Sequence, residues 1–285
     1  MGKETVTASH VTTIIPTLDE RVHVVRSVES ALPLGPVFVV DSGSTDGTGE
    51  LAASAGASVV EHTWEGYAAQ KNWALEHLPI ETDWILMLDA DEYLTDKLRA
   101  EIVAEVSRST AAVGYLVPRW NIFMGRLLKH AWWYPDYQLR LFRHGQGRYE
   151  QRSVHEHVIV SGTVDVLSEP SYHENLKGID AFLHRHERYA ALEAEEILRH
   201  RDRDHRGRRG GRLLGTKQER RRALKMSVWY RLPARPLLRF LWMFVLRRGF
   251  LDGREGLVYC ELISAYEAMI DAKLLELQKS RAGSA

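Results

Sequence analysis

The segment Trp84-Ile-Leu-Met-Leu-Asp-Ala-Asp-Glu92 carries the strongest structural signal in this chain. Its first five residues are all apolar, which is typical of a strand covered on both faces in the middle of a sheet. Two carboxylates, Asp89 and Asp91, follow directly. Open α/β sheets bind their ligands at the carboxyl ends of the strands. The sequence therefore indicates a site at this strand end.

The chain before this stretch alternates apolar runs with segments of helical spacing. The runs Val11–Pro16, Val37–Val40 and Ser58–Glu61 predict three further strands. Apolar residues at helical spacing predict helices over Asp19–Leu32, Glu50–Ala55, Gly66–His77 and Asp96–Ser107. This alternation predicts an α/β fold with a mixed, mostly parallel sheet and helices on both faces.

The pattern changes after Gly114. Shorter and more antiparallel strands are expected over Tyr115–Val117, Gln138–Phe142, Val154–Val160 and Thr163–Leu167. A loop with Trp132, Trp133 and Tyr134 could stack against an acceptor sugar or could pack over the sheet. Residues 176–285 read as a helical, basic C-terminal extension, which gives two regions, 1–175 and 176–285.

Composition excludes several protein classes. The formal net charge of the 285 residues is zero, so the chain shows no bias toward nucleic acid. One cysteine, Cys260, excludes a disulfide framework and a cysteine-based zinc site. We find no secretory signal and no apolar run of about 20 residues that would span a bilayer. A cytoplasmic protein is expected.

The segment Arg199–Arg248 is strongly basic, with seventeen Lys and Arg against three Asp and Glu. Its second part, Met226–Phe250, interleaves aromatic and aliphatic residues with arginines. This composition suits a helix lying on an anionic membrane surface. Nucleic-acid or protein binding, or a homo-oligomer contact between the C-terminal helices, is the alternative.

The chemistry of Asp89 and Asp91 suits a small hard cation. Two carboxylates at a strand end could bind Mg²⁺ or Mn²⁺, which also bridges phosphate oxygens. Such an ion would offset the charge on a nucleoside diphosphate that leaves a nucleotide sugar. Alternation along an extended chain would send both side chains to one face. His173 is a further candidate ligand for the metal or the diphosphate. The alternative is that the acids merely end the strand and cap a helix.

Other polar residues follow the remaining strands. Asp41 could accept hydrogen bonds from a uracil ring or a ribose hydroxyl. Asp46 lies in a Gly- and Ser-rich turn whose amides could approach a nucleotide. Lys71 could reach a phosphate or the base. The alternatives are ordinary turn chemistry for the two aspartates and a solvated surface position for the lysine.

The segment Val154-His155-Glu156-His157 offers a general base. Glu156 could take the proton from an acceptor hydroxyl, whereas either histidine could complete the ligands of the metal. In a strand, Glu156 and the two histidines point to opposite faces. An exposed edge strand without a chemical role is the alternative.

The order of these motifs resembles that of family 2 glycosyltransferases with the GT-A fold. The resemblance rests on four segments: Ile14-Ile-Pro-Thr-Leu-Asp-Glu20, Val39-Val-Asp-Ser-Gly-Ser-Thr-Asp-Gly-Thr48, Gly66-Tyr-Ala-Ala-Gln-Lys-Asn72 and Trp84–Glu92. The chain is most similar to small bacterial enzymes that add a sugar during assembly of the lipopolysaccharide core or related envelope glycans. The segments Tyr134–Arg143 and Val154–Glu156 extend this similarity.

The resemblance implies a GT-A catalytic domain over 1–175, with a nucleotide-sugar half at about 10–110 and an acceptor half at about 111–175. It implies a UDP-linked donor, inversion by one displacement, and a lipid-linked or lipopolysaccharide-type acceptor at the inner face of the membrane. The implied donor residues are Thr17, Glu20, Asp41, Asp46, Lys71 and Asp89, with metal at Asp91 and Asp89. Asp19 departs from the family pattern, in which Asn is usual.

Two other functions are less consistent with the sequence. A sugar nucleotidyltransferase would carry a Gly-rich, basic phosphate loop after the first strand, where this chain has Pro16-Thr-Leu-Asp-Glu20. A non-catalytic nucleotide- or sugar-binding protein at the membrane surface would not require the ordered strand-end acids.

Overall fold

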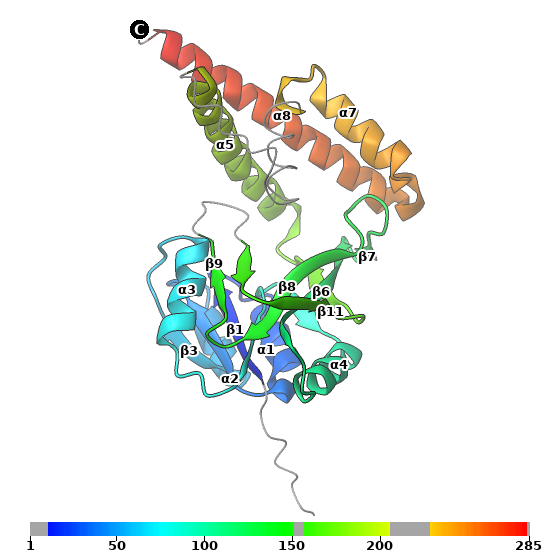
Figure 1. Cartoon of the computed structure of the whole chain (residues 1–285). Coiled ribbons are helices and arrows are strands. Elements are labelled where there is room, and N and C mark those ends of the chain that lie inside the picture. The colour runs from blue at the N-terminus through cyan, green and yellow to red at the C-terminus, as the bar shows by residue number, and fades with distance from the viewer. Residues whose placement is uncertain (1–10, 151–156, 206–228, 284–285) are drawn as a thin grey trace, which may run out of the picture. The chain divides into compact units, whose positions relative to one another are not determined.

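The computed structural model describes residues 11–150, 157–205 and 229–283 (Figure 1). Contacts divide the chain into two compact units. Unit 1 comprises Met1–Leu127 and Tyr134–Leu176, and unit 2 comprises Leu128–Trp133 and Lys177–Ala285. Unit 2 therefore includes a short piece of the region that the sequence analysis assigned to the catalytic domain.

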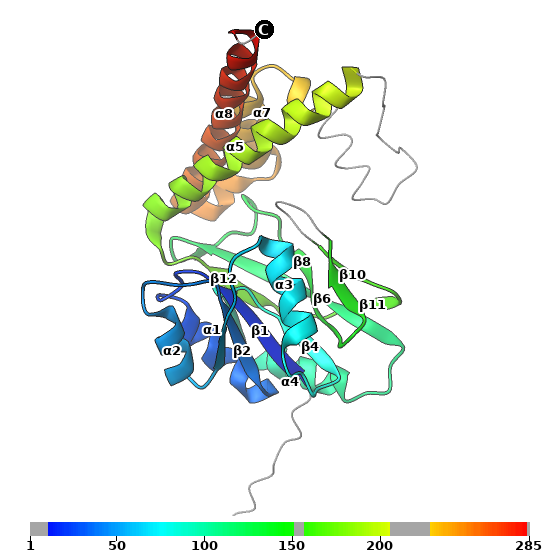
Figure 2. The same ribbon diagram turned by 90° about the vertical axis from the view of Figure 1, so that its left-hand side faces the viewer.

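Unit 1 is built on a ten-stranded sheet with the order β3-β2-β1-β4-β8-β6-β12-β5, and β7 and β11 also pair with β6. Its first four strands are parallel and lie side by side (Figure 2). They are β1 (Val11–Thr17), β2 (Val37–Asp41), β3 (Ser58–Glu61) and β4 (Trp84–Met87). All four predicted strands are present, and the carboxyl ends of β1, β2 and β4 carry the predicted polar residues.

Helices cover both faces of these strands, as predicted. One core contains Val39 and Leu86 and is closed by α1 (Val24–Ala31), α2 (Thr48–Ser54) and α4 (Asp96–Val106). The other core contains Ile85 and Met87, and α3 (Tyr67–His77) covers it. Successive residues of β4 thus serve opposite cores, which explains why the whole strand is apolar.

The first helix begins later than predicted, at Val24 instead of Asp19. Asp19 has a positive φ of 52°, a conformation that cannot continue into a right-handed helix. Residues 19–21 form a loop whose amides bond to the turn after β2. After α1, a short 3₁₀ turn, η1 (Leu32–Leu34), leads into β2.

The second half of unit 1 is less antiparallel than predicted. β6 (Ala112–Phe123) runs for twelve residues and pairs antiparallel with β8 (Asp136–Arg143) and β7 (Arg126–Leu127). It also pairs parallel with β11 (Thr163–Val166) and β12 (Ser171–Glu174). The predicted antiparallel pairing is confirmed for β6 with β8. The strand predicted over Tyr115–Val117 is longer than expected, β11 is parallel to β6, and β12 was not predicted.

Three further strands complete unit 1. β5 (Glu92–Leu94), which the sequence did not predict, pairs antiparallel with β12 at the edge of the sheet. β9 (Gly147–Tyr149) and β10 (Val158–Val160) form a separate two-stranded ribbon. The strand predicted over Val154–Val160 is thus observed only from Val158, and residues 151–156 lie outside the described ranges.

Unit 2 is helical, as the sequence predicted for its C-terminal part. Its elements are α5 (Gly178–His205), η2 (Trp229–Arg231), α7 (Arg235–Leu241), the π-helical turn η3 (Trp242–Leu246), η4 (Gly249–Asp252) and α8 (Gly253–Gly283). Its core joins Ala190 and Ala194 of α5 to Ile270 and Leu274 of α8. Within the described ranges, no helix has the length and apolar composition needed to cross a membrane.

The loop Leu128–Trp133 belongs to unit 2 because Asp252 binds its backbone. The Asp252 carboxylate accepts hydrogen bonds from the amides of Lys129, His130 and Ala131 at 3.2, 2.8 and 2.7 Å. The ring of Trp132 lies 5.0 Å from that of Tyr259. Trp132 therefore packs on the helices, whereas the sequence analysis offered only a sugar platform or packing over the sheet.

Candidate active site

Asp89 and Asp91 lie in a tight turn between β4 and β5. The amide of Leu88 still donates to Ile14 of β1 at 3.0 Å, and the amide of Glu92 donates to the carbonyl of Asp89 at 2.9 Å. Asp89 and Asp91 are therefore not part of an extended strand, and the alternation argument that placed both on one face does not apply. Each carboxylate has its own set of partners.

Asp89 is held between two cations. The Arg140 guanidinium on β8 donates to its Oδ2, and the Lys71 ammonium on α3 lies 3.5 Å from its Oδ1. Burial acts to raise the pKa of Asp89, but the charges of Arg140 and Lys71 outweigh it and hold that pKa well below its usual range. Asp89 is therefore ionised at neutral pH, with about a third of its side chain exposed (35%).

Lys71 is buried, so the alternative of a solvated surface lysine was wrong. Besides Asp89, it lies over the ring of Tyr149, 5.1 Å from the ring centroid. A buried ammonium needs a compensating negative charge. Asp89 supplies one, and a phosphate group of a bound donor could supply another.

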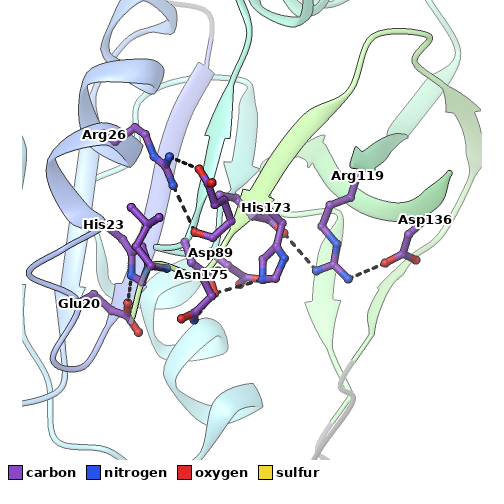
Figure 3. Close-up of polar contacts among 12 residues, drawn as sticks. Glu20, His23, Arg26, Asp89, Arg119, Asp136, His173 and Asn175 are labelled. Carbon is purple, nitrogen blue, oxygen red and sulfur yellow. Dashed lines mark hydrogen bonds and ion pairs between the residues drawn. The ribbon is translucent and has the colours of Figure 1, made fainter. Parts of the chain in front are cut away.

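A chain of buried charges supports Asp89 from within the sheet. Arg140 also donates to Glu92 Oε1 at 2.5 Å, and Arg119 of β6 donates to the same oxygen at 3.2 Å. Arg119 also donates a hydrogen bond to Asp136 Oδ2 of β8 at 2.5 Å (Figure 3). Burial acts to lower the pKa of Arg140 and of Arg119, but the neighbouring carboxylates raise both. The network therefore keeps its charges and ties β5, β6 and β8 together beneath Asp89.

Glu92, Arg119 and Asp136 were not predicted as functional residues. Their pairing depends on the register of β6 with β8, in which Arg119 lies opposite Asp136, and no local pattern reveals that register. The one available signal was the position of Arg140 inside an otherwise apolar strand, Leu139-Arg-Leu-Phe142. A charge there requires a buried partner.

Asp91 lies beside His173, the residue predicted as a further metal ligand. The His173 Nε2 is 3.1 Å from Asp91 Oδ2, and Asn175 Nδ2 donates to the same oxygen at 3.2 Å. The amide of Glu174 bonds to the backbone carbonyl of Asp91 at 3.0 Å. The fold thus brings together two predicted ligands that are 82 residues apart in the chain.

The Asp91–His173 pair fits a divalent cation. Two ligands bound about 2.1 Å from one octahedral ion, at right angles, lie about 3 Å apart, and the observed separation is 3.1 Å. Within the described part of the chain, no group of three or more His, Cys, Asp or Glu side chains could hold a metal. One or two protein carboxylates are nevertheless sufficient for Mg²⁺ when substrate phosphates and water supply the other ligands. Asp89 fits the ion less well because Arg140 and Lys71 already neutralise it.

Thr17 and Asp41 join the ends of β1 and β2. The Thr17 hydroxyl donates to Asp41 Oδ1 at 2.9 Å, and the amide of Ser44 donates to Asp41 Oδ2 at 2.8 Å. Asp41 is buried. Both predicted donor residues therefore shape the turn after β2, and Asp41 would have to bind a nucleotide while keeping these bonds.

Asp46 and Glu20 bind the two neighbouring loops to each other. Asp46 accepts hydrogen bonds from the amides of Thr48 at 3.0 Å and Arg21 at 3.1 Å. Partial burial acts to raise the pKa of Asp46, but these bonds and the Thr48 hydroxyl lower it overall. The amide of Glu20 donates a hydrogen bond to Thr48 Oγ1 at 2.8 Å. The Glu20 carboxylate oxygen Oε2 lies 2.6 Å from His23 Nδ1 (Figure 3). The predicted donor loops are therefore a single hydrogen-bonded assembly.

The predicted general base lies outside the described residues. Glu156 and His155 fall within 151–156, whereas His157 is described, exposed, and immediately precedes β10. The carbonyl of His157 accepts a hydrogen bond from the amide of Glu150 at 3.1 Å. The assignment of the base to Glu156 stays a prediction.

Comparisons with known proteins identify the family of this chain. The sequence profile of glycosyl transferase family 2 matches residues 12–160, more than half of the chain. The lipopolysaccharide core biosynthesis glycosyltransferase LpsC of Rhizobium meliloti is 32% identical over 186 residues, which span 63% of this chain and 68% of that protein. An uncharacterized glycosyltransferase of Rickettsia typhi, RT0209, is 25% identical over 284 residues, spanning 95% of this chain and 89% of that protein.

Solved structures align over a smaller part. Mannosyl-3-phosphoglycerate synthase from Rubrobacter xylanophilus gives a TM-score of 0.35 at 21% identity, over 39% of this chain and 40% of that one. Glucosyl-3-phosphoglycerate synthase from Mycobacterium tuberculosis gives 0.34 at 22% identity, over 40% and 44%. The chain thus spans less than half of these structures. The profile match and the identity to LpsC establish that the chain belongs to glycosyl transferase family 2.

Proposed function

We propose that this protein transfers a sugar from a UDP-linked donor to a hydroxyl of a lipid-linked or lipopolysaccharide-type acceptor, with inversion at the anomeric carbon. The observation that carries the proposal is the pairing of Asp91 with His173 at 3.1 Å beside the Lys71–Asp89–Arg140 cluster. The name of the relative LpsC supports the choice of acceptor.

The cluster suits the departure of a nucleoside diphosphate. The leaving group gains negative charge as the glycosidic bond breaks, and preorganised positive groups stabilise that charge. Lys71 would supply one such group from α3. Asp91 and His173 would hold Mg²⁺ or Mn²⁺, and a bound ion of this kind would neutralise the diphosphate as a Lewis acid. Asp89 would orient the ribose or the donor sugar through its exposed edge.

The donor loops complete the nucleotide site in this proposal. Thr17, Glu20, Asp41 and Asp46 are supported as donor residues by the hydrogen bonds that join the ends of β1 and β2. These bonds keep the loops rigid, so the uracil and ribose would meet preformed partners. Rigid positioning reduces the entropy lost when a ligand binds.

Inversion requires a base on the acceptor side. Glu156 would accept the proton of the acceptor hydroxyl while that oxygen attacks the anomeric carbon and the diphosphate leaves in the same step. The proposed acceptor also suggests where the protein works. We place it in the cytoplasm, peripherally at the inner face of the cell membrane, where such acceptors would be presented.

The test is Asp91→Ala, assayed for sugar transfer to membranes and for donor hydrolysis across a panel of nucleotide sugars with Mg²⁺, Mn²⁺ or a chelator. Loss of electrostatic stabilisation at the leaving group should reduce the rate by about 100- to 1,000-fold, without a change in the thermal midpoint. Asp165→Asn, an exposed carboxylate on β11, is the matched control and should keep full activity.

Wild-type turnover by Asp91→Ala would contradict the metal site. Nucleotide-sugar binding by the unmodified protein without transfer or hydrolysis of any donor would instead favour a non-catalytic binding protein. Consumption of a nucleoside triphosphate with release of pyrophosphate would favour a nucleotidyltransferase.

A further inference from the structure

The helix formed by α7 and η3, residues 235–246, buries an arginine and exposes a row of aliphatic side chains. Arg235 points inward and is 1% exposed. It pairs with Glu267 at 3.2 Å and with Asp271, both on α8. Two turns later, Met243 is also buried. A surface helix usually buries its aliphatic stripe and exposes its charges, so the arrangement here is unusual.

The outward side of the same helix is aliphatic. Leu237, Leu238, Leu241 and Val245 recur at helical spacing and are 57, 38, 43 and 51% exposed. The row continues through Leu246, Phe250 and Leu251, which are 74, 50 and 51% exposed. We call these seven residues the α7 apolar face. Large exposed apolar patches are typical of interaction sites, and each of these seven residues is at least 38% exposed.

The charge of the segment that carries the α7 apolar face has one sign. The sequence contains no Asp or Glu between Arg220 and Leu251. Arg248 is exposed within the row of apolar residues. Arg247 lies over the rings of Trp133 and Trp242 at 4.6 and 5.3 Å, and Trp133 is 54% exposed. Aliphatic side chains beside tryptophan and arginine match the composition of segments that lie at a bilayer interface.

We propose that the α7 apolar face docks on an anionic lipid bilayer, with its leucines among the upper acyl chains and Arg248 at the headgroup phosphates. The helix of residues 235–246 is much too short to span a bilayer, so it would lie in the interface plane. This inference specifies the surface by which unit 2 would reach a membrane. It does not depend on the sugar-transfer chemistry of unit 1.

A second copy of the chain is a poorer occupant of this face. In a symmetric dimer the same patch meets itself, which would bring Arg247 and Arg248 of both copies together. No carboxylate between residues 220 and 251 could offset that repulsion. Phosphate headgroups provide the missing negative charge.

The test is flotation of the full-length protein with vesicles of phosphatidylcholine containing 30% phosphatidylglycerol, and with phosphatidylcholine alone. Leu237→Ser/Leu241→Ser should weaken binding to the anionic vesicles by about tenfold or more, because each leucine contributes through the apolar area it buries. Leu192→Ser/Leu275→Ser, two exposed leucines of 38 and 53% on α5 and α8, is the matched control and should bind normally.

A second pair of variants tests the charge. Arg248→Gln should weaken binding to the anionic vesicles by about fivefold, the effect of one basic residue near such a surface. Its control, Arg199→Gln on α5, removes a similarly exposed arginine whose side chain is 58% accessible. Neither change should alter binding to phosphatidylcholine alone.

Three outcomes would overturn the proposal. The wild type could fail to float with anionic vesicles, the control pair could lose binding as strongly as the α7 pair, or the α7 pair could convert a dimer to a monomer with flotation unchanged. Donor hydrolysis in solution, measured on the same samples, should be equal in all variants. If no sample hydrolyses a donor, the proposed function is contradicted but the docking surface is not.

Discussion

Two buried arginines, Arg140 in unit 1 and Arg235 in unit 2, show how differently the two units use the same interaction. Each is at least nine-tenths buried and each binds two carboxylates. Arg235 joins α7 to α8. Arg140 holds Asp89 at the carboxyl end of β4, two residues from Asp91. A buried ion pair is therefore not a sign of a site by itself; its position at a strand end, beside further titratable groups, is what marks a site.

The largest effect is expected from Arg140→Met. The change leaves Asp89 and Glu92 without a shared cation, and removing one partner of a buried pair costs about 3–5 kcal/mol of stability. Asp89 would also lose its fixed position, so donor hydrolysis should fall by about 100-fold or more per folded molecule. Calorimetry and a hydrolysis assay on the same sample measure the two effects.

Arg140→Lys is the control for that variant. It keeps the positive charge without the planar fork of the guanidinium, so it should recover part of the stability and little of the activity. Full activity in Arg140→Met would show that the network only holds the sheet together, as Arg235 holds the helices.

Arg235→Met should affect stability alone. It leaves Glu267 buried without its cation, with a comparable cost of about 3–5 kcal/mol, which denaturant unfolding would measure. Donor hydrolysis per folded molecule should stay at the wild-type rate, because none of the groups proposed for the reaction touches Arg235. A lower rate of hydrolysis per folded molecule in Arg235→Met would show that the two arginines do not differ in this way.

The smallest effect is expected from Asp46→Asn, which should change how stability depends on pH in acid. Hydrogen bonds lower the pKa of Asp46 in the folded protein. Because an unfolded aspartate titrates near about 3.9, the bonds stabilise the fold above that pH, and this contribution is lost as the pH falls toward the folded pKa. Asp46→Asn should therefore flatten the loss of stability between about pH 5 and pH 3, as measured by urea midpoints. Asp165→Asn should keep the wild-type pH profile.

The sequence predicted the elements whose signals are local. β1 to β4 are short apolar runs ended by polar residues, and α1 has a clear apolar stripe. In contrast, α3 buries the polar residues Gln70, Lys71 and Asn72. The metal candidates Asp91 and His173 were also proposed from sequence, and the structure places them side by side. What could not be predicted depends on long-range register: β5 and β12 have only three and four residues, too few to show a period.

The charge network and the buried Arg235 of α7 were missed for the same reason. Glu92 and Arg119 gain their roles only when β5, β6, β8 and β12 are aligned. In the C-terminal region, composition indicated a basic, aromatic segment but not which side of the helix faces solvent. Arg235 had the same appearance in the sequence as the exposed Arg248, and only packing on α8 distinguishes them.

Asp252 has a consequence for how this architecture can be rearranged. Its carboxylate accepts hydrogen bonds from the amides of residues 129–131. Unit 2 is therefore built from two separate segments of the chain. A truncation after Leu176 would remove the acceptor of three backbone amides and the ring against which Trp132 packs. Recombination at a single position in the chain could therefore not exchange the whole of unit 2. A transplanted sheet would have to bring its own matching loop, so the two parts are expected to be inherited together.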